Sequence, residues 1–177
     1  MKKAFLGLTI LFLFANISCS KDTIENNEET IIEEFEDTDE IVVPAVKSIE
    51  TEIVSLINAY RIDNGLQALV LEEGIVKVKA EEHNHYMIAR VEISHDLFDA
   101  RADVIRDAIN ATRVGENVAY GYITAKDVVD AWIASDGHRE NILGDYNYFE
   151  ISAEQSEGKV WYFTNIFVKK ISLNKER

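Results

Sequence analysis

The segment from Lys159 to Lys170 constrains the fold most, because it is apolar on both faces. Side chains alternate across a strand, so the two faces carry separate sets: Val160, Tyr162, Ile166 and Val168 on one, and Trp161, Phe163 and Phe167 on the other. A strand of this kind lies centrally in a sheet that is covered on both sides. The run 155–158 predicts a hairpin turn to a second strand over 148–154.

Helical periodicity dominates the chain before these strands. Apolar side chains recur at steps of three and four, and Gly or a capping residue marks several ends. Thr124, with Asp127 three residues later, forms a variant of the capping box. Four helices are expected: Ser48 to Asn64, Ile75 to about Arg90, Asp99 to Ala111, and Thr124 to Gly137. Antiparallel strands with helices on each face predict an α+β fold, a three-layer α-β-α sandwich with a central, mainly antiparallel sheet.

The N-terminus has the pattern of an export signal. Lys2 and Lys3 precede twelve mostly apolar residues, Ala4 to Ala15, which is shorter than the ~20 residues of a spanning helix. Residues 1–18 are therefore predicted to be a signal peptide. The only cysteine, Cys19, follows at once and resembles the lipidated cysteine of bacterial lipoproteins. The resemblance implies acylation with a fatty acid such as palmitate and an anchor in the outer membrane, at the cell surface. The alternative is a secreted protein with a free thiol.

Charge is concentrated in the segment that follows. Residues 22–40 carry ten acids and no Lys or Arg, a composition that does not fold alone. We expect a flexible acidic tether over 19–46, a single domain over 47–170 and a short tail over 171–177. The whole chain has 18 basic and 32 acidic side chains, a net charge of -14, and this balance excludes the basic surface that nucleic-acid binding needs.

Four histidines and one carboxylate are candidates for chemistry. His83 and His85 are two residues apart on a predicted helix, so they point to nearly opposite faces and are expected to be structural or solvated. His95 and His138 each follow a predicted helix, in loops that display side chains. Glu116 stands in an otherwise apolar turn into a strand.

The order and spacing of short motifs resemble the CAP superfamily, which groups cysteine-rich secretory proteins, venom antigens and plant pathogenesis-related proteins. The similarity extends over about residues 50–169. Within the superfamily, the chain resembles a bacterial branch without disulfides. It rests on these runs: Ile57-Asn58-Ala59-Tyr60-Arg61, Ile93-Ser94-His95, Gly115-Glu116-Asn117-Val118-Ala119-Tyr120-Gly121, Ala131-Trp132, Gly137-His138-Arg139-Glu140-Asn141-Ile142-Leu143 and Trp161-Tyr162-Phe163-Thr164-Asn165. The fold of that family is an α-β-α sandwich, the same architecture that the pattern of strands and helices predicts.

The resemblance also implies a site. CAP proteins have a cleft in which two histidines and two acids can hold a divalent cation such as zinc, and His95, His138 and Glu116 match three of these positions. Ser135 stands at the fourth, with Asp136 beside it. Two imidazoles and one carboxylate would leave an open coordination position for water. In the alternative, these side chains hold the cleft in shape through hydrogen bonds alone.

Two functions are compatible with this pattern. The first is a lipid-anchored binding module whose His/Glu-lined cleft takes a lipid, glycan, peptide or protein ligand. The second is a metal-dependent hydrolase, peptidase-like, with His95, Glu116 and His138 as candidate catalytic residues. The sequence shows no nucleophile elbow with a Ser-His-Asp order, and it lacks the second acid. Both observations favour binding over catalysis.

Overall fold

A computed structural model describes residues 45–171 of the chain. The predicted signal peptide, Cys19, nearly all of the acidic tether and the tail from residue 172 lie outside the described residues. Within residues 45–171, every helix is too short or too polar to cross a membrane.

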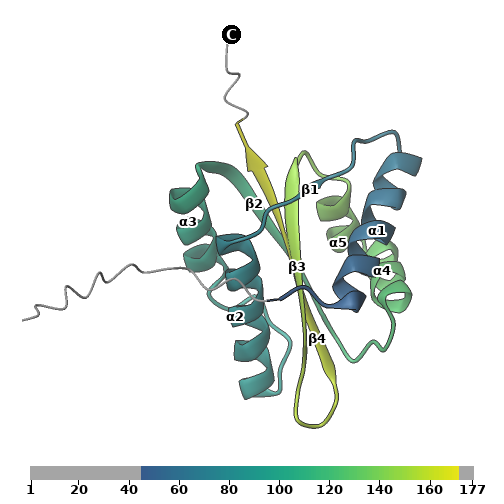
Figure 1. Cartoon of the computed structure of the whole chain (residues 1–177), viewed down its shortest axis with the longest axis vertical. Coiled ribbons are helices and arrows are strands. Elements are labelled where there is room, and N and C mark those ends of the chain that lie inside the picture. Colours follow the sequence, from purple (N-terminus) through teal and green to yellow (C-terminus); the bar gives the residue numbers. More distant parts are fainter. Residues whose placement is uncertain (1–44, 172–177) are drawn as a thin grey trace, which may run out of the picture. The chain divides into compact units, whose positions relative to one another are not determined.

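The domain has three layers (Figure 1). A four-stranded sheet with the order β1-β3-β4-β2 forms the middle layer. Helices α2 and α3 cover one face, and α1, α4 and α5 cover the other. The elements are α1 Ser48–Asp63, β1 Val70–Leu71, α2 Ile75–Arg90, α3 Phe98–Ile109, β2 Ala111–Tyr120, α4 Ala125–Ala134, α5 Asp136–Ile142, β3 Tyr148–Gln155 and β4 Trp161–Lys170. The predicted α-β-α sandwich is confirmed.

Strand β4 is central, as its two apolar faces predict. It pairs antiparallel with β2 on one side and with β3 on the other. The hairpin between β3 and β4 is also confirmed. The two-residue strand β1 pairs parallel to β3 and was not expected, because so short a segment has no periodicity of its own.

The two faces of β4 enter different apolar cores. Phe163 and Phe167 pack with Trp132 in the core on the side of α1 and α4. Ile166 and Val168 pack in the core on the side of α2 and α3. These side chains are at most 1% exposed, and burial of each stabilises the fold by about 1.5–3 kcal/mol relative to exposure.

Beyond its short pairing with β1, the outer edge of β3 has backbone groups that are hydrogen-bonded by buried charged side chains. The N–H of Ala153 donates to Glu50 (2.8 Å), and Lys77 Nζ donates to the carbonyl of Ile151 (2.7 Å). Lys77 and Glu50 form a 2.8 Å ion pair, and both side chains are 1% exposed. Strand-edge groups that would otherwise be unpaired are thus bonded inside the domain.

The end of the fourth predicted helix requires a correction. The capping residue is confirmed, because Thr124 Oγ1 accepts from the N–H of Asp127 (3.1 Å). The helix nevertheless ends at Ala134, since Ser135 has an extended backbone (φ -91°, ψ 124°). A new helix, α5, begins at Asp136 and continues through Gly137. His138, which we expected in a loop, therefore lies on α5.

Candidate functional site

Glu116 is the centre of the candidate site. It lies within β2, opposite Ile166 of β4, so it belongs to the strand itself and not to a turn before it, as the sequence had suggested. Its side chain is 1% exposed. A carboxylate at this depth stays ionised only if hydrogen-bond donors or cations surround it.

Arg101 of α3 is the cation beside Glu116. Its Nε lies 3.1 Å from Oε2, and its Nη2 lies 2.9 Å from Oε1 and 2.8 Å from Oε2. Its Nη1 donates to the carbonyl of Asp96 (2.6 Å). A forked contact of this kind is among the strongest hydrogen-bonded pairs in proteins. Arg101 joins α3, β2 and the loop before α3 at one point.

His95 also contacts Glu116. Its Nδ1 lies 2.8 Å from Oε1, while the side chain is 53% exposed. His95 lies in the loop between α2 and α3, as predicted. The ring thus connects the buried carboxylate to the surface.

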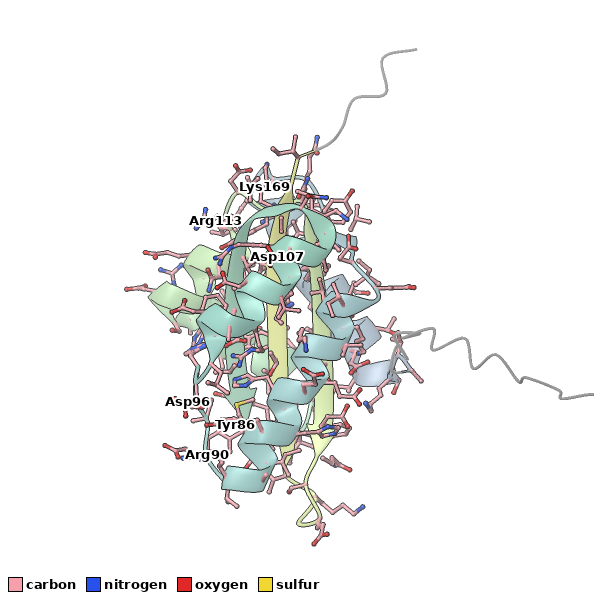
Figure 2. The ribbon with its side chains drawn as sticks, turned by 90° about the vertical axis from the view of Figure 1, so that its left-hand side faces the viewer. Tyr86, Arg90, Asp96, Asp107, Arg113 and Lys169 are labelled. Atoms are coloured by element: carbon pink, nitrogen blue, oxygen red, sulfur yellow. The ribbon has the colours of Figure 1, made fainter. Side chains whose placement is uncertain are left out.

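The loop that carries His95 is attached to the end of α2. Tyr86 Oη donates to Asp96 Oδ2 (2.9 Å), and the guanidinium of Arg90 lies 5.3 Å from the centre of the Tyr86 ring. Figure 2 shows these three side chains together at one end of α2. Asp96, the residue after His95, is therefore held through its side chain by Tyr86 and through its carbonyl by Arg101.

His83 is a site residue that the sequence did not reveal. The prediction that it and His85 point apart is confirmed, since His83 is buried and His85 is exposed. However, Nε2 of His83 lies 3.8 Å from Glu116 Oε1 and 2.8 Å from the carbonyl of Ser94. Burial lowers the pKa of His83 more than the nearby Glu116 raises it. The sequence signal for His83 is its spacing of three residues from Ala80 and four from Met87, which places it on the buried side of α2.

The pKa of Glu116 lies below its ordinary value. Burial alone would raise it, but the hydrogen bond from His95, the charge and hydrogen bonds of Arg101, and the charge interaction with His83 together have the larger effect. Glu116 is therefore a carboxylate at neutral pH.

His138 approaches the site from the opposite helix layer. Its carbonyl accepts from Nδ2 of Asn117 (3.0 Å). Asn141 Nδ2 donates to the carbonyl of Glu116 (3.1 Å) and to Oδ1 of Asn117 (2.9 Å). These amide contacts attach α5 to β2. Burial, and to a lesser degree the charge of His95, lowers the pKa of the His138 ring.

A cavity of about 260 Å³ lies beside His138. Its walls are mostly apolar and aromatic, with Ser135 and His138 as polar members. The lining residues are Ile93, Val118, Ala119, Tyr120, Tyr122, Ala131, Trp132, Ser135 and His138. The structure thus brings two of the predicted positions, His138 and Ser135, to one cavity, and the other two, His95 and Glu116, to a direct contact.

The donor set does not form a ready metal site. Within residues 45–171, no three His, Asp or Glu side chains are arranged so that they could hold an ion. Glu116 is already bonded to Arg101 and His95, and Ser135 supplies no carboxylate at the fourth position. Metal binding by His95, Glu116 and His138 stays a prediction of the resemblance.

Comparison with known proteins agrees with the fold. A family model for the cysteine-rich secretory protein family, CAP, matches residues 54–167. The chain is 32% identical over 121 residues to the uncharacterized protein YkwD of Bacillus subtilis strain 168; the match covers 66% of this chain and 46% of YkwD. The chain therefore spans less than half the length of that relative.

Solved structures have the same architecture. An outer surface protein of Borrelia burgdorferi superposes with a TM-score of 0.64 at 21% identity, over 73% of this chain and 98% of that one. An extracellular protein of Bacillus anthracis that contains an SCP domain has a TM-score of 0.58 at 24% identity, over 68% of this chain and 40% of that one. These similarities concern the fold.

Proposed function

The chain belongs to the cysteine-rich secretory protein family, CAP, and on that premise we propose that it is an exported binding module. Its binding site is the cavity between β2 and the helix pair α4 and α5, beside His138. The ligand is a lipid, glycan or peptide with an apolar portion. No step of chemistry is needed for this role.

The lining of the cavity is the observation that carries the proposal. Tyr120 and Tyr122 supply aromatic surface, and Ser135 and His138 supply hydrogen-bonding groups. Ligand sites typically combine apolar walls with a few placed polar groups. Such a lining favours an amphipathic ligand, whose apolar part lies against the aromatic walls and whose polar end meets His138.

Exposed apolar side chains extend this surface. Tyr120 is 52% exposed and Ile93 is 39% exposed, and both also line the cavity. Ile123, close in sequence, is 80% exposed. Exposed apolar surface often marks a binding site, and Tyr120 and Ile93 offer such surface at the cavity itself.

The proposed location is the outer surface of the cell. The N-terminal signal, the tether and Cys19 support export and lipid anchoring, and one relative in fold is named an outer surface protein. Labelling of cells with a radioactive fatty acid tests the anchor. Label on the wild type and none on Cys19→Ala is expected, and equal label on both would contradict lipidation.

Titration of small ligands into the protein, monitored by NMR, tests binding in the cavity beside His138. We would add decanoate, chitotriose or tetraalanine to the purified protein and record the backbone signals of Tyr120, Ser135 and His138. Decanoate should shift these signals. Ala131→Phe places a ring in the cavity and should weaken binding at least about tenfold, a loss of about 1.4 kcal/mol.

The matched control is Ala134→Phe, on the exposed side of the same helix, which should bind as the wild type does. Cleft signals that respond to none of the three probes, or undiminished binding by Ala131→Phe, would contradict the proposal.

One contact favours a hydrolase as the second candidate. The 2.8 Å approach of His95 Nδ1 to Glu116 is the arrangement by which a carboxylate orients an imidazole as a general base. An ester or peptide substrate whose hydrolysis is lost in His95→Ala, with the fold intact, would support it.

A further inference from the structure

We infer that Arg101 is the resident cation of this site and that its guanidinium occupies the place at Glu116 that a divalent metal would need. The inference concerns Glu116 and its contacts, and it does not depend on the ligand proposed for the cavity.

Every acceptor position of Glu116 is in use. An ionised carboxylate has two oxygens and about four lone-pair positions. Oε1 accepts from Arg101 Nη2 and from His95 Nδ1, and Oε2 accepts from Arg101 Nε and Nη2. A metal ion that binds this carboxylate at ~2.0–2.2 Å must displace at least one of these contacts.

The charges of the site also oppose a divalent ion. The charges of Arg101 and Glu116 sum to zero, and Ser135 brings no second carboxylate. The side chain of Arg101 is 9% exposed and that of Glu116 is 1% exposed, so water screens little of the repulsion between a guanidinium and an incoming dication. The pair is fixed in position because Nη1 of Arg101 is also bonded, to Asp96.

The same pair determines how His95 presents itself. A carboxylate only accepts hydrogen bonds, so the proton of the neutral ring is on Nδ1, which faces Glu116. Nε2 is then the acceptor, on a side chain that is half exposed. The site offers a hydrogen-bond acceptor at the surface where a metal-loaded site would offer a Lewis acid.

Zinc chloride is the probe that tests this inference. Calorimetry and NMR would be run on the full-length protein, and binding would be assigned to the site only if it shifts the ring signals of His95 or His138. The wild type should show no such binding. Arg101→Ala frees the carboxylate and should show such binding, with an affinity at least about tenfold above the upper limit measured for the wild type, and the double variant with His95→Ala should lose that gain.

A second measurement on the wild type keeps the inference testable if Arg101→Ala does not fold. Nitrogen-15 correlation spectra of the His95 ring distinguish a proton on Nδ1 from one on Nε2, and a proton on Nδ1 is expected. The matched control Arg106→Ala removes a half-buried arginine of the same helix that pairs with Asp103, and it should bind no zinc at the site. Zinc binding by the wild type at His95, a folded Arg101→Ala with no gain, or a proton on Nε2 would each overturn the inference.

Discussion

Replacement of Glu150 by glutamine is expected to remove a loss of folding stability that the wild type shows as the pH rises. Glu150 lies in β3 and is 2% exposed. Its Oε1 accepts from the N–H of Ile151 (3.0 Å). Burial raises the pKa of Glu150 to about 7, although that hydrogen bond and the charge of Lys77 act in the opposite direction.

The magnitude follows from the two pKa values. In the unfolded chain the carboxyl ionises near its ordinary value of 4.5, and in the folded chain near 7. At about 1.4 kcal/mol per pKa unit, the folded state loses about 3 kcal/mol of stability relative to the unfolded state as the pH rises from below 4.5 to above 7. Below pH 4.5 this loss is absent, because the carboxyl of Glu150 is then protonated in both the folded and the unfolded state.

Glu150→Gln retains an oxygen that can accept from Ile151 but has no proton to lose. Its free energy of unfolding minus that of the wild type should rise by about 3 kcal/mol between about pH 4 and pH 8. Urea unfolding at unit steps of pH, followed by tryptophan fluorescence, measures that difference. Glu157→Gln, an equal charge change in the exposed hairpin turn, is the control and should give a flat difference. A flat difference for Glu150→Gln as well, or one that falls with pH, would show that burial does not raise the pKa of Glu150 in the folded protein.

Two further substitutions test the packing around the site. Gly115→Ala should destabilise the fold by about 1–3 kcal/mol in urea unfolding, because a Cβ there would collide with the hydroxyl of Tyr146. The control is Gly137→Ala, where a Cβ meets nothing within 4 Å, and it should be neutral or stabilising by up to about 1 kcal/mol. Equal effects of the two substitutions would contradict the close contact at Gly115. Trp132→Phe removes the indole N–H bond to the carbonyl of Val118 (3.1 Å) and part of a ring that is 1% exposed, and the two losses together should cost about 1–3 kcal/mol. A thermal unfolding midpoint unchanged from the wild type would show that this bond does not stabilise the fold.

The layers of the fold were predictable because its main elements carry strong local patterns. The two apolar faces of 159–170 indicated a central strand, and the stripes of α1 and α2 indicated amphipathic helices. The break at Ser135 was not predictable, because serine and the Asp136-Gly137 pair suit either a helix end or a new helix start. The same local ambiguity placed His138 in a loop.

The centre of the site was only half predictable. Motif spacing identified His95 and Glu116, which the structure joins at 2.8 Å. Arg101 gave no signal, since an arginine on an amphipathic helix is typically solvated, and its partner lies fifteen residues away on another element. His83 was missed because its neighbour Glu116 lies on another element and comes close only in the folded domain.

A crystal structure of the protein grown with decanoate and zinc chloride would test the binding cavity and the Arg101–Glu116 pair together. We predict density for the acyl chain against Tyr120 and Tyr122, with its carboxylate toward His138. We also predict no anomalous zinc peak at Glu116, where the Arg101 guanidinium remains in its forked contact. A zinc ion within ~2.0–2.2 Å of Glu116, with Arg101 displaced and the cavity empty of decanoate, would contradict both the proposed binding site and the proposed role of Arg101.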